Sequence, residues 1–488
     1  MAKRSRGIDK LQYGDFQTPI DLARRICAVL SESIDAPCTV LEPTCGQGSL
    51  LAAAAEAFPR AQRIIGLDRN ASYLKQARSR LNAILANART TNAEVTLCES
   101  DFFKTDWQKH RLFFQPPLLV IGNPPWVTNS SLATVESDNL PNKSNINGVR
   151  GIDAITGGGN FDISESMLLT MVRWFDGQRG ALAMLCKSAV ARKVMRNAWA
   201  RQANVARADL FRIDAKAEFG ASVDAALLLV QFSPEKTSCR CHVHPSLEES
   251  SGQSFGKVGD RLVADMGLYR KQQHLANGSG ARWRSGIKHD CARVMQLRRE
   301  GQQFQNGLNE LVELESRFLY PMLKASDLTK AQPIPRYWML VPQQFVGQET
   351  DRLAKLAPKT WAYLNQHAEA LRSRASVVYR GKPDYSVFGV GKYSFSRWKV
   401  AISGLAKVPN FHVVGPHQRK PTVFDDTCYF ITCDHVRRAT NLCRVLNSQP
   451  AVEFFKSLMF TDEKRPITAK LLGLLNMDNL LNETSVVS

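Results

Sequence analysis

Apolar runs of strand length alternate with segments of helical periodicity in the first half of the chain. The runs that match strands are residues 39–41, 63–68, 95–100, 118–122, 181–186 and 225–232. The helical segments between them are residues 49–58, 74–84, 161–175 and 189–203. Repeated strand–helix units give a parallel sheet with helices on both faces. The pattern therefore predicts an α/β fold for this half.

The regular alternation stops close to residue 233. Residues 233–259 are rich in Ser, Gly and charged side chains, which is typical of a linker or an exposed excursion. Beyond them the chain has short β-like runs, many turn residues and dense Arg, Lys, Tyr and Trp. We therefore predict a first domain over residues 1–235, a linker or excursion over 236–280, and a second, mixed α+β domain over 281–488.

Charge narrows the choice of partners. The 488 residues carry 64 Lys and Arg against 45 Asp and Glu, a formal net charge of +19. Such an excess favours a polyanionic partner, because each neutralised phosphate releases counterions. The 11 Cys are scattered, and no apolar stretch is long enough to span a membrane. We expect a cytoplasmic protein with reduced thiols and no membrane partner. The Cys and His of residues 239–244 have no second pair at zinc-finger spacing, so we expect no metal.

A glycine-containing loop follows the first predicted strand. Gly46 and Gly48 let the backbone turn tightly and approach a ligand, at the strand end where α/β sheets bind ligands. Asp68 ends the second strand, 20 residues after Gly48, where a carboxylate can accept both hydroxyls of a ribose. Asp101 and Phe102 follow the third strand and could take the amino group and the face of an adenine. The alternative is an ordinary glycine turn with capping aspartates. It accounts less well for the order of strand, glycine loop, helix and second strand ending in an acid.

The tetrapeptide Asn123-Pro124-Pro125-Trp126 follows the fourth predicted strand. An adenine amine is a weak nucleophile because its lone pair is delocalised into the ring. The side-chain carbonyl of Asn123 and the backbone carbonyl of Pro124 could accept its two hydrogens and push the nitrogen towards sp3 geometry. Pro125 keeps Pro124 extended, and Trp126 offers a π face to an unstacked base. A proline turn beside a core Trp is the structural alternative, but the position after a ligand-binding loop favours catalysis.

These residues resemble the motifs of the N6-adenine DNA methyltransferases of restriction–modification systems, in the gamma-class order of cofactor loop, tetrapeptide and C-terminal recognition domain. The resemblance implies a Rossmann-like class I methyltransferase domain, S-adenosylmethionine as cofactor and duplex DNA as partner. The cofactor site that it implies consists of Thr18, Pro19, Glu42, Thr44, Gly46, Gly48, Asp68, Asp101, Phe102 and Asn123. Glu42 would hold the methionine amino group and Asp68 the ribose. Phe219 stands where the family has an aromatic ring against the flipped base, and Trp126 replaces the usual Tyr or Phe.

The C-terminal half resembles the recognition region of related adenine methyltransferases at residues 283–290, 395–399 and 425–429. Cations beside aromatic residues in this half suit phosphate contact and base stacking. The candidate DNA contacts are Arg380, Lys382, Lys392, Arg397, Lys399, Arg419 and Lys420. We also expect the polar segment 127–160 to form a loop over the target base, with Lys143 and Arg150 at phosphates. Each group of cations taken alone is better explained by a solvated face, and only together, beside the +19 net charge, do they favour nucleic acid.

Three other functions stay open on the sequence. RNA adenine methylation would use the same tetrapeptide and loop, although the large C-terminal half favours duplex recognition. A protein glutamine presents a similar nitrogen to the tetrapeptide but needs no large basic domain. The intact tetrapeptide disfavours a catalytically silent DNA-binding subunit. Because no nuclease motif occurs, a cognate restriction endonuclease would be a separate chain.

Overall fold

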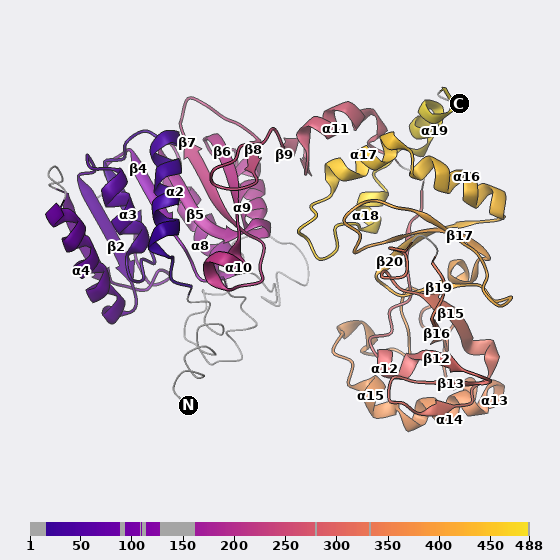
Figure 1. Ribbon diagram of the computed structural model, residues 1–488. Helices are drawn as coiled ribbons and strands as arrows, with labels where there is room; N and C mark the ends of the chain where they lie inside the picture. The colour runs from indigo at the N-terminus through magenta and orange to yellow at the C-terminus, as the bar shows by residue number, and fades with distance from the viewer. Residues whose placement is uncertain are drawn as a thin grey trace. The chain divides into compact units, whose positions relative to one another are not determined.

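The computed structural model describes residues 16–87, 93–107, 109, 114–126, 162–278, 281–330 and 333–486. The chain forms two compact units, Met1–Met266 and Gly267–Ser488 (Figure 1). Each unit has its own sheet or sheets and is described by itself. Within the ranges given above, no helix is both long and apolar enough to cross a membrane, and no cluster of three potential metal ligands occurs.

The first unit is built on one ten-stranded sheet with the order β10-β9-β8-β6-β7-β5-β4-β1-β2-β3. Its strands are β1 (Thr39–Glu42), β2 (Arg63–Asp68), β3 (Glu94–Glu99), β4 (Leu118–Gly122), β5 (Gly180–Lys187), β6 (Val205–Ile213), β7 (Ala225–Phe232), β8 (Arg240–His244), β9 (Ser254–Val258) and β10 (Arg261–Val263). Strands β3, β2, β1, β4 and β5 run parallel, which confirms the predicted α/β class.

Strand β7 departs from the predicted parallel arrangement, because it runs antiparallel to both β5 and β6. The connection from β6 to β7 consists of residues 214–224. It is shorter than the dozen or more residues that a parallel crossover needs. The expectation of a wholly parallel sheet is therefore wrong at this strand.

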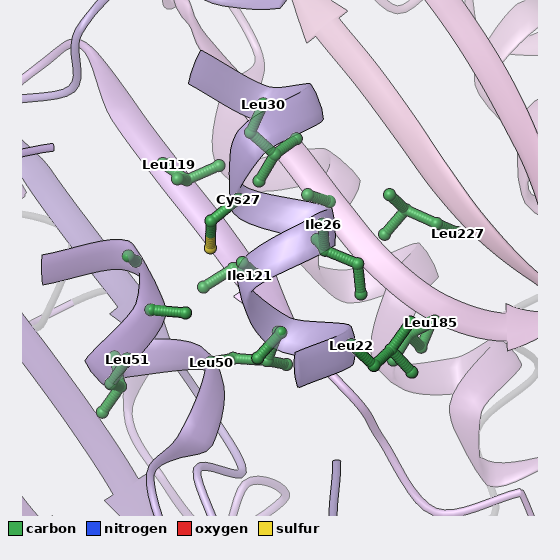
Figure 2. Close-up of a cluster of buried hydrophobic side chains, with 14 of the residues drawn as sticks. Leu22, Ile26, Cys27, Leu30, Leu50, Leu51, Leu119, Ile121, Leu185 and Leu227 are labelled. Atoms are coloured by element: carbon green, nitrogen blue, oxygen red, sulfur yellow. The ribbon is translucent and has the colours of Figure 1, made fainter. Parts of the chain in front are cut away.

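Helices cover the sheet and complete its core. They are α2 (Ile20–Ser33), α3 (Ser49–Ala57), α4 (Ala71–Asn87), α8 (Ile163–Val172), α9 (Ser188–Ala200) and α10 (Ala215–Phe219). Figure 2 shows Leu22, Ile26 and Leu30 of α2 packed beside Leu119 of β4 and Leu227 of β7, and all five side chains are buried. The three α2 residues recur every four positions and so share one helix face. This packing fixes the N-terminal end of α2 and so positions residues 16–19, which directly precede the helix.

The stretch that we expected as a linker carries three strands of the sheet instead. Strand β8 pairs in parallel with β6, β9 pairs antiparallel with β8, and β10 pairs antiparallel with β9. Cys241 and Phe255 are buried. These strands are only three to five residues long, and they extend an existing sheet. The prediction of a linker over 236–280 is therefore wrong for these strands, and the unit boundary falls after Met266, where α11 (Met266–Gln272) begins.

The second unit contains two sheets, with the orders β11-β20-β17-β18 and β14-β13-β12-β16-β15-β19. The strands are β11 (Arg284–Ser285), β12 (Gln296–Glu300), β13 (Gln303–Gln305), β14 (Leu311–Val312), β15 (Leu319–Leu323), β16 (Tyr337–Leu340), β17 (Trp398–Ser403), β18 (His412–Val414), β19 (Val423–Phe424) and β20 (Cys428–Cys433). The helices are α12 (Ala292–Met295), α13 (Leu353–Leu356), α14 (Pro358–Gln366), α15 (Ala368–Arg372), α16 (Val436–Leu446), α17 (Gln449–Leu458), α18 (Ala469–Leu472) and α19 (Met477–Val486). This is the mixed α+β fold that the sequence predicted.

The stretch from Arg284 to Lys288 joins the two sheets of the second unit. Ser285 pairs with Tyr429 of β20. The backbone N–H of Ile287 donates to Phe424 of β19 at 2.7 Å. A Cβ on Gly286 would lie 1.9 Å from the carbonyl oxygen of Asp425, so only glycine allows this close approach of the two backbones.

Candidate active site

The loop between β1 and α3 requires both of its glycines. Gly46 and Gly48 have positive φ values of +48° and +76°. A Cβ on Gly48 would lie 2.7 Å from the Cβ of Ala77, so a side chain at that position would also clash. Asp68, at the end of β2, accepts a hydrogen bond from the backbone N–H of Gly46 at 2.8 Å. The loop is thus closed against the neighbouring strand, and its backbone is held at the carboxyl edge of the sheet.

Two polar atoms are buried beside this loop without a hydrogen-bond partner among the described residues. They are Oε2 of Glu42 and Oγ1 of Thr44. The Glu42 side chain is 3% exposed, and burial raises the pKa of its carboxyl well above the usual range. The nearby carboxylate of Asp68 raises this pKa further. A buried carboxyl in this state fits a ligand that brings a positive charge or a strong donor.

The amide of Asn123 is held in one orientation. Its Nδ2 donates to the backbone carbonyl of Phe16 at 2.7 Å and lies 3.3 Å from Oγ1 of Thr18. Its Oδ1 is buried and has no hydrogen-bond partner in the described part of the chain. Asn123 follows β4 directly, and Pro19 ends the approach to α2, so two elements converge here. The fixed NH2 group leaves a carbonyl oxygen that can accept from a substrate.

Three aromatic rings surround the end of the tetrapeptide. Trp126 is 6% exposed, and its ring centroid lies 5.3 Å from that of Phe219 in an edge-to-face arrangement. Phe16 lies 5.7 Å from Trp126 and 6.2 Å from Phe219. The structure thus brings the predicted pair Trp126 and Phe219 together. It adds Phe16, which lies two residues before Thr18 and which the sequence analysis did not single out.

Asp101 and Phe102 have structural partners in the first unit. The carboxylate of Asp101 accepts from the backbone N–H of Phe103 at 2.9 Å, as in a local turn. Phe102 is buried, with ring centroids 5.1 Å from Trp107 and 6.2 Å from Trp174. These contacts explain the positions of Asp101 and Phe102 without any bound ligand. Their assignment to the adenine of the cofactor stays a prediction.

The structure separates the predicted DNA contacts into exposed and internal cations. The exposed ones are Arg380, Lys382, Lys392, Arg397 and Arg419. Lys420 is half-buried, and its Nζ donates to the backbone carbonyls of Ser316 and Leu319, so it braces the fold. Lys143 and Arg150 lie outside the described residues.

Lys399 is a correction to the predicted DNA contacts. It is 1% exposed, and its Nζ donates to the carbonyls of Ser396 at 2.5 Å and Thr422 at 2.8 Å. The rings of Phe424 and Phe430 lie 6.0 and 5.9 Å from Nζ. The side chain is enclosed because β17 is buried on both of its faces from Lys399 to Ser403. Burial lowers the pKa of Lys399 to about 7.

We expect Lys399→Met to change how stability depends on pH. The pKa of Lys399 is lowered from 10.5 to about 7 on folding, so between these values the unfolded chain binds more protons. The unfolding free energy of the natural chain should therefore rise with pH across this window, relative to the Met variant. Urea unfolding at pH 7 and pH 10 measures the difference. Lys392→Met, at an exposed position, is the control and should show the same pH dependence of stability as the natural chain. If the unfolding free energy of Lys399→Met also changed with pH as that of the natural chain does, the buried-charge account would be wrong.

Two hollows open on the second unit, and both carry more cations than acids. The larger, of about 600 Å³, lies where the stretch 284–288 joins the sheets. Its charged lining residues are Arg284, Lys288, Asp426, Arg465 and Lys470. The smaller, of about 310 Å³, has Arg372, Arg374, Arg380, Lys382 and Asp384 as its charged lining residues.

The two hollows adjoin, and aromatic rings line each of them. Tyr379 of the smaller hollow and Phe388 of the larger one are in edge-to-face contact at 5.5 Å. The guanidinium of Arg284 lies 4.5 Å from the ring centroid of Tyr393, and that of Arg374 lies 3.7 Å from Tyr379. Cations and rings thus share one surface of the unit.

Comparisons with known proteins agree with this geometry. Residues 34–113 match the family model described as a methyltransferase domain. The chain is 40% identical over 474 residues to the type II methyltransferase M.NspV of Nostoc sp. (strain ATCC 29411 / PCC 7524), which covers 96% of this chain and 97% of that protein. The type IIL restriction-modification enzyme MmeI, in complex with DNA, is similar in fold, with a TM-score of 0.57 and 10% identity. That likeness covers 89% of this chain but only 62% of the MmeI chain, and it shows the fold alone.

The sheet, the glycine loop and the matched domain define a class I methyltransferase whose cofactor is S-adenosylmethionine. This confirms the fold and the cofactor expected from the sequence. More particularly, the chain belongs to the family of type II DNA methyltransferases of restriction–modification systems, as its identity to M.NspV over nearly the whole of both chains shows.

Proposed function

We propose that this methyltransferase modifies N6 of an adenine flipped out of duplex DNA. The fixed amide of Asn123 carries the proposal, because its buried Oδ1 is left to accept from a substrate. An exocyclic amine offers two hydrogens, and the backbone carbonyl of Pro124 is the second acceptor. Drawing both hydrogens away returns lone-pair density to the nitrogen. With S-adenosylmethionine bound, that nitrogen would form the new N–C bond as the bond between the methyl carbon and sulfur breaks. The bonding electrons would stay on sulfur as a thioether, and the surplus proton of the methylated amine would pass to water.

The polar groups around the glycine loop fit S-adenosylmethionine. When bound, this cofactor supplies an electrophilic methyl group on a sulfonium. We assign its ammonium to Glu42, because a cation stabilises a buried carboxylate whose Oε2 has no other partner among the described residues. The two oxygens of a carboxylate accept about four hydrogen bonds in total. Asp68 can therefore accept from ribose hydroxyls as well as from Gly46 and Asn70. Thr18, Pro19 and Thr44 would line the methionine moiety, and Asp101 and Phe102 the adenine.

The ring cluster of Phe16, Trp126 and Phe219 suits capture of the flipped base. A base that leaves the duplex loses stacking, and an aromatic face in the pocket replaces it. Trp126 is positioned for this at the end of the tetrapeptide, and Phe219 meets it edge-on.

Trp126→Ala should therefore lose about 1–3 kcal/mol of base stacking and lower turnover more than duplex affinity. Single-turnover methyl transfer and fluorescence anisotropy of a labelled duplex measure the two effects. Phe411→Ala, in the core of the second unit, is a control for general loss of packing. Equal losses of turnover and duplex affinity in Trp126→Ala would count against base capture by this ring.

We assign duplex contact in the second unit to the surface of the two adjoining hollows, together with the exposed Lys392, Arg397 and Arg419. The lining carries a net positive charge in each hollow, which suits the phosphate backbone. The aromatic rings beside Arg284 and Arg374 hold these guanidinium groups in place. The +19 net charge of the chain supports the same partner.

The double variant Lys470→Gln/Arg380→Gln removes one exposed cation from each hollow. Affinity falls as salt rises, so a plot of log affinity against log salt has a negative slope. Each lost phosphate contact should make this slope shallower by about 1. Anisotropy titrations of a duplex at several NaCl concentrations measure this slope. Arg444→Gln, on exposed α16 outside both hollows, is the matched control. An unchanged slope in the double variant would remove these hollows from the contact surface.

A direct competition tests the class of substrate. Duplex DNA, structured RNA and a glutamine-containing peptide are offered together with labelled methyl donor. We expect label in the DNA alone, because the large second unit suits recognition of a duplex sequence, which neither the peptide nor a single-stranded RNA loop offers. Label in RNA or peptide would overturn the proposal. A cognate restriction endonuclease, if the host has one, would act on the same site as a separate chain.

A further inference from the structure

Lys187 connects two segments that lie on either side of residues 127–161 in the sequence. It is the last residue of β5, and its Nζ donates to the backbone carbonyl of Trp126 at 3.0 Å. The same Nζ forms an ion pair with Oδ2 of Asp162 at 2.6 Å. The Asp162 side chain is 8% exposed and that of Lys187 is 27% exposed, so the pair is largely shielded from water.

Asp162 holds Lys187 from a rigid position. It is the N-cap of α8, where its Oδ1 accepts from the backbone N–H of Ser164 at 3.1 Å and from the Ser164 hydroxyl at 2.6 Å. An ammonium has three donors, so one can serve the carboxylate while another serves the carbonyl. The carboxylate thus keeps Nζ next to the carbonyl of Trp126.

Strand β5 anchors Trp126 at two points. The indole Nε1 of Trp126 donates to the carbonyl of Leu185 at 3.4 Å, while Lys187 binds the backbone carbonyl of Trp126. The carbonyl of Leu185 and the side chain of Lys187 come from positions two residues apart at the C-terminal end of β5. The anchors restrain both the ring plane and the backbone of Trp126, and Pro124 lies only two residues upstream.

We propose that Lys187 is a positioning residue for the tetrapeptide, which aims the carbonyl of Pro124 and the ring of Trp126 at the flipped base. This inference rests on the proposed function. In this role Lys187 contacts neither the base nor the cofactor and acts only through the tetrapeptide. Loss of the bond to Trp126 lets the tetrapeptide shift, and misplacement by about 1 Å can cost about 100-fold in rate.

The test compares Lys187→Met with Lys187→Arg, Asp162→Asn and a matched control, Lys193→Met. Lys193 pairs with Glu165 of α8 at 2.7 Å, so it also ties a lysine to the first turn of that helix. Asn remains a good N-cap, so Asp162→Asn should fold and lose only the charge that holds Lys187. The substrate is a duplex carrying the recognition sequence, identified by sequencing modified adenine in an expressing host. A second duplex carries 2-aminopurine in place of the target adenine.

We expect Lys187→Met to lower the single-turnover rate about 10- to 100-fold and to weaken the 2-aminopurine signal. Duplex affinity and cofactor affinity should stay within about threefold of the natural chain. Lys187→Arg should restore most of the rate, Asp162→Asn should fall between, and Lys193→Met should match the natural chain. Rates for Lys187→Met and Asp162→Asn equal to that of Lys193→Met would overturn the inference, as would a parallel loss of both affinities. If the natural chain leaves adenine unmethylated, the proposed function fails instead.

Discussion

Asn123→Ala is expected to reduce methyl transfer about 100- to 1000-fold, the range found when one group that stabilises developing charge is removed. Alanine deletes the buried Oδ1 that we assign to the amine and leaves the acceptor of Pro124 alone. The cofactor affinity should change little, because Glu42 and Asp68 hold their positions through other contacts. Single-turnover assays with labelled methyl donor, together with calorimetric cofactor titrations, separate the two effects.

Asn123→Asp is the matched control for this result. It keeps an acceptor oxygen but loses the NH2 group that donates to Phe16 and Thr18. Its activity should lie between those of the natural chain and the Ala variant. If Asn123→Ala turned over at the natural rate, the acceptor role would be wrong.

Glu42→Gln should weaken cofactor binding about 10- to 100-fold, since a hydrogen bond to a charged group contributes about 1.5–3 kcal/mol. The same variant should melt at a higher temperature than the natural chain when both are free of cofactor. Burial raises the pKa of Glu42 in the folded state, so above the unfolded pKa the folded chain binds more protons than the unfolded one. The stability of the natural chain therefore falls, relative to the Gln variant, as pH rises from about 5 to 8.

Thermal melts with and without S-adenosylmethionine at pH 5 and pH 8 measure both effects of Glu42→Gln. The cofactor should raise the melting temperature of the natural chain far more than that of the variant. Glu56→Gln on α3 is the control, because Glu56 pairs with Arg24 at 3.0 Å on the surface. If Glu42→Gln bound the cofactor as tightly as the natural chain, the assignment of the cofactor ammonium to Glu42 would be wrong.

Local patterns were enough to predict which candidate site residues of the first unit lie close together. The glycine loop follows β1, Asp68 is the last residue of β2, and Asn123 follows β4, and the ends of parallel strands meet at one edge of a sheet. Their order along the chain therefore predicted their proximity. Phe219 was placed by resemblance, and the structure puts its ring against Trp126.

Other features depend on contacts that no local pattern encodes. Lys399 follows Trp398 in a run of cations and rings, but from that position on β17 is covered on both faces, and Lys399 lies near Phe430. Strands β8–β10 are only three to five residues long, and β8 joins the sheet by pairing with β6, which lies about 30 residues earlier in the sequence. The contact of Lys187 with Trp126 joins residues 61 positions apart, so no spacing could reveal it.

The most direct test of the central claim is to identify the modified nucleoside. Duplex DNA methylated by the purified chain with labelled S-adenosylmethionine is digested to nucleosides and separated by chromatography with mass detection. The acceptor pair at Asn123 and Pro124 predicts label on an exocyclic amine, and the proposed adenine substrate places all of it in N6-methyl-2′-deoxyadenosine. Label in N4-methylcytosine or in 5-methylcytosine would contradict it.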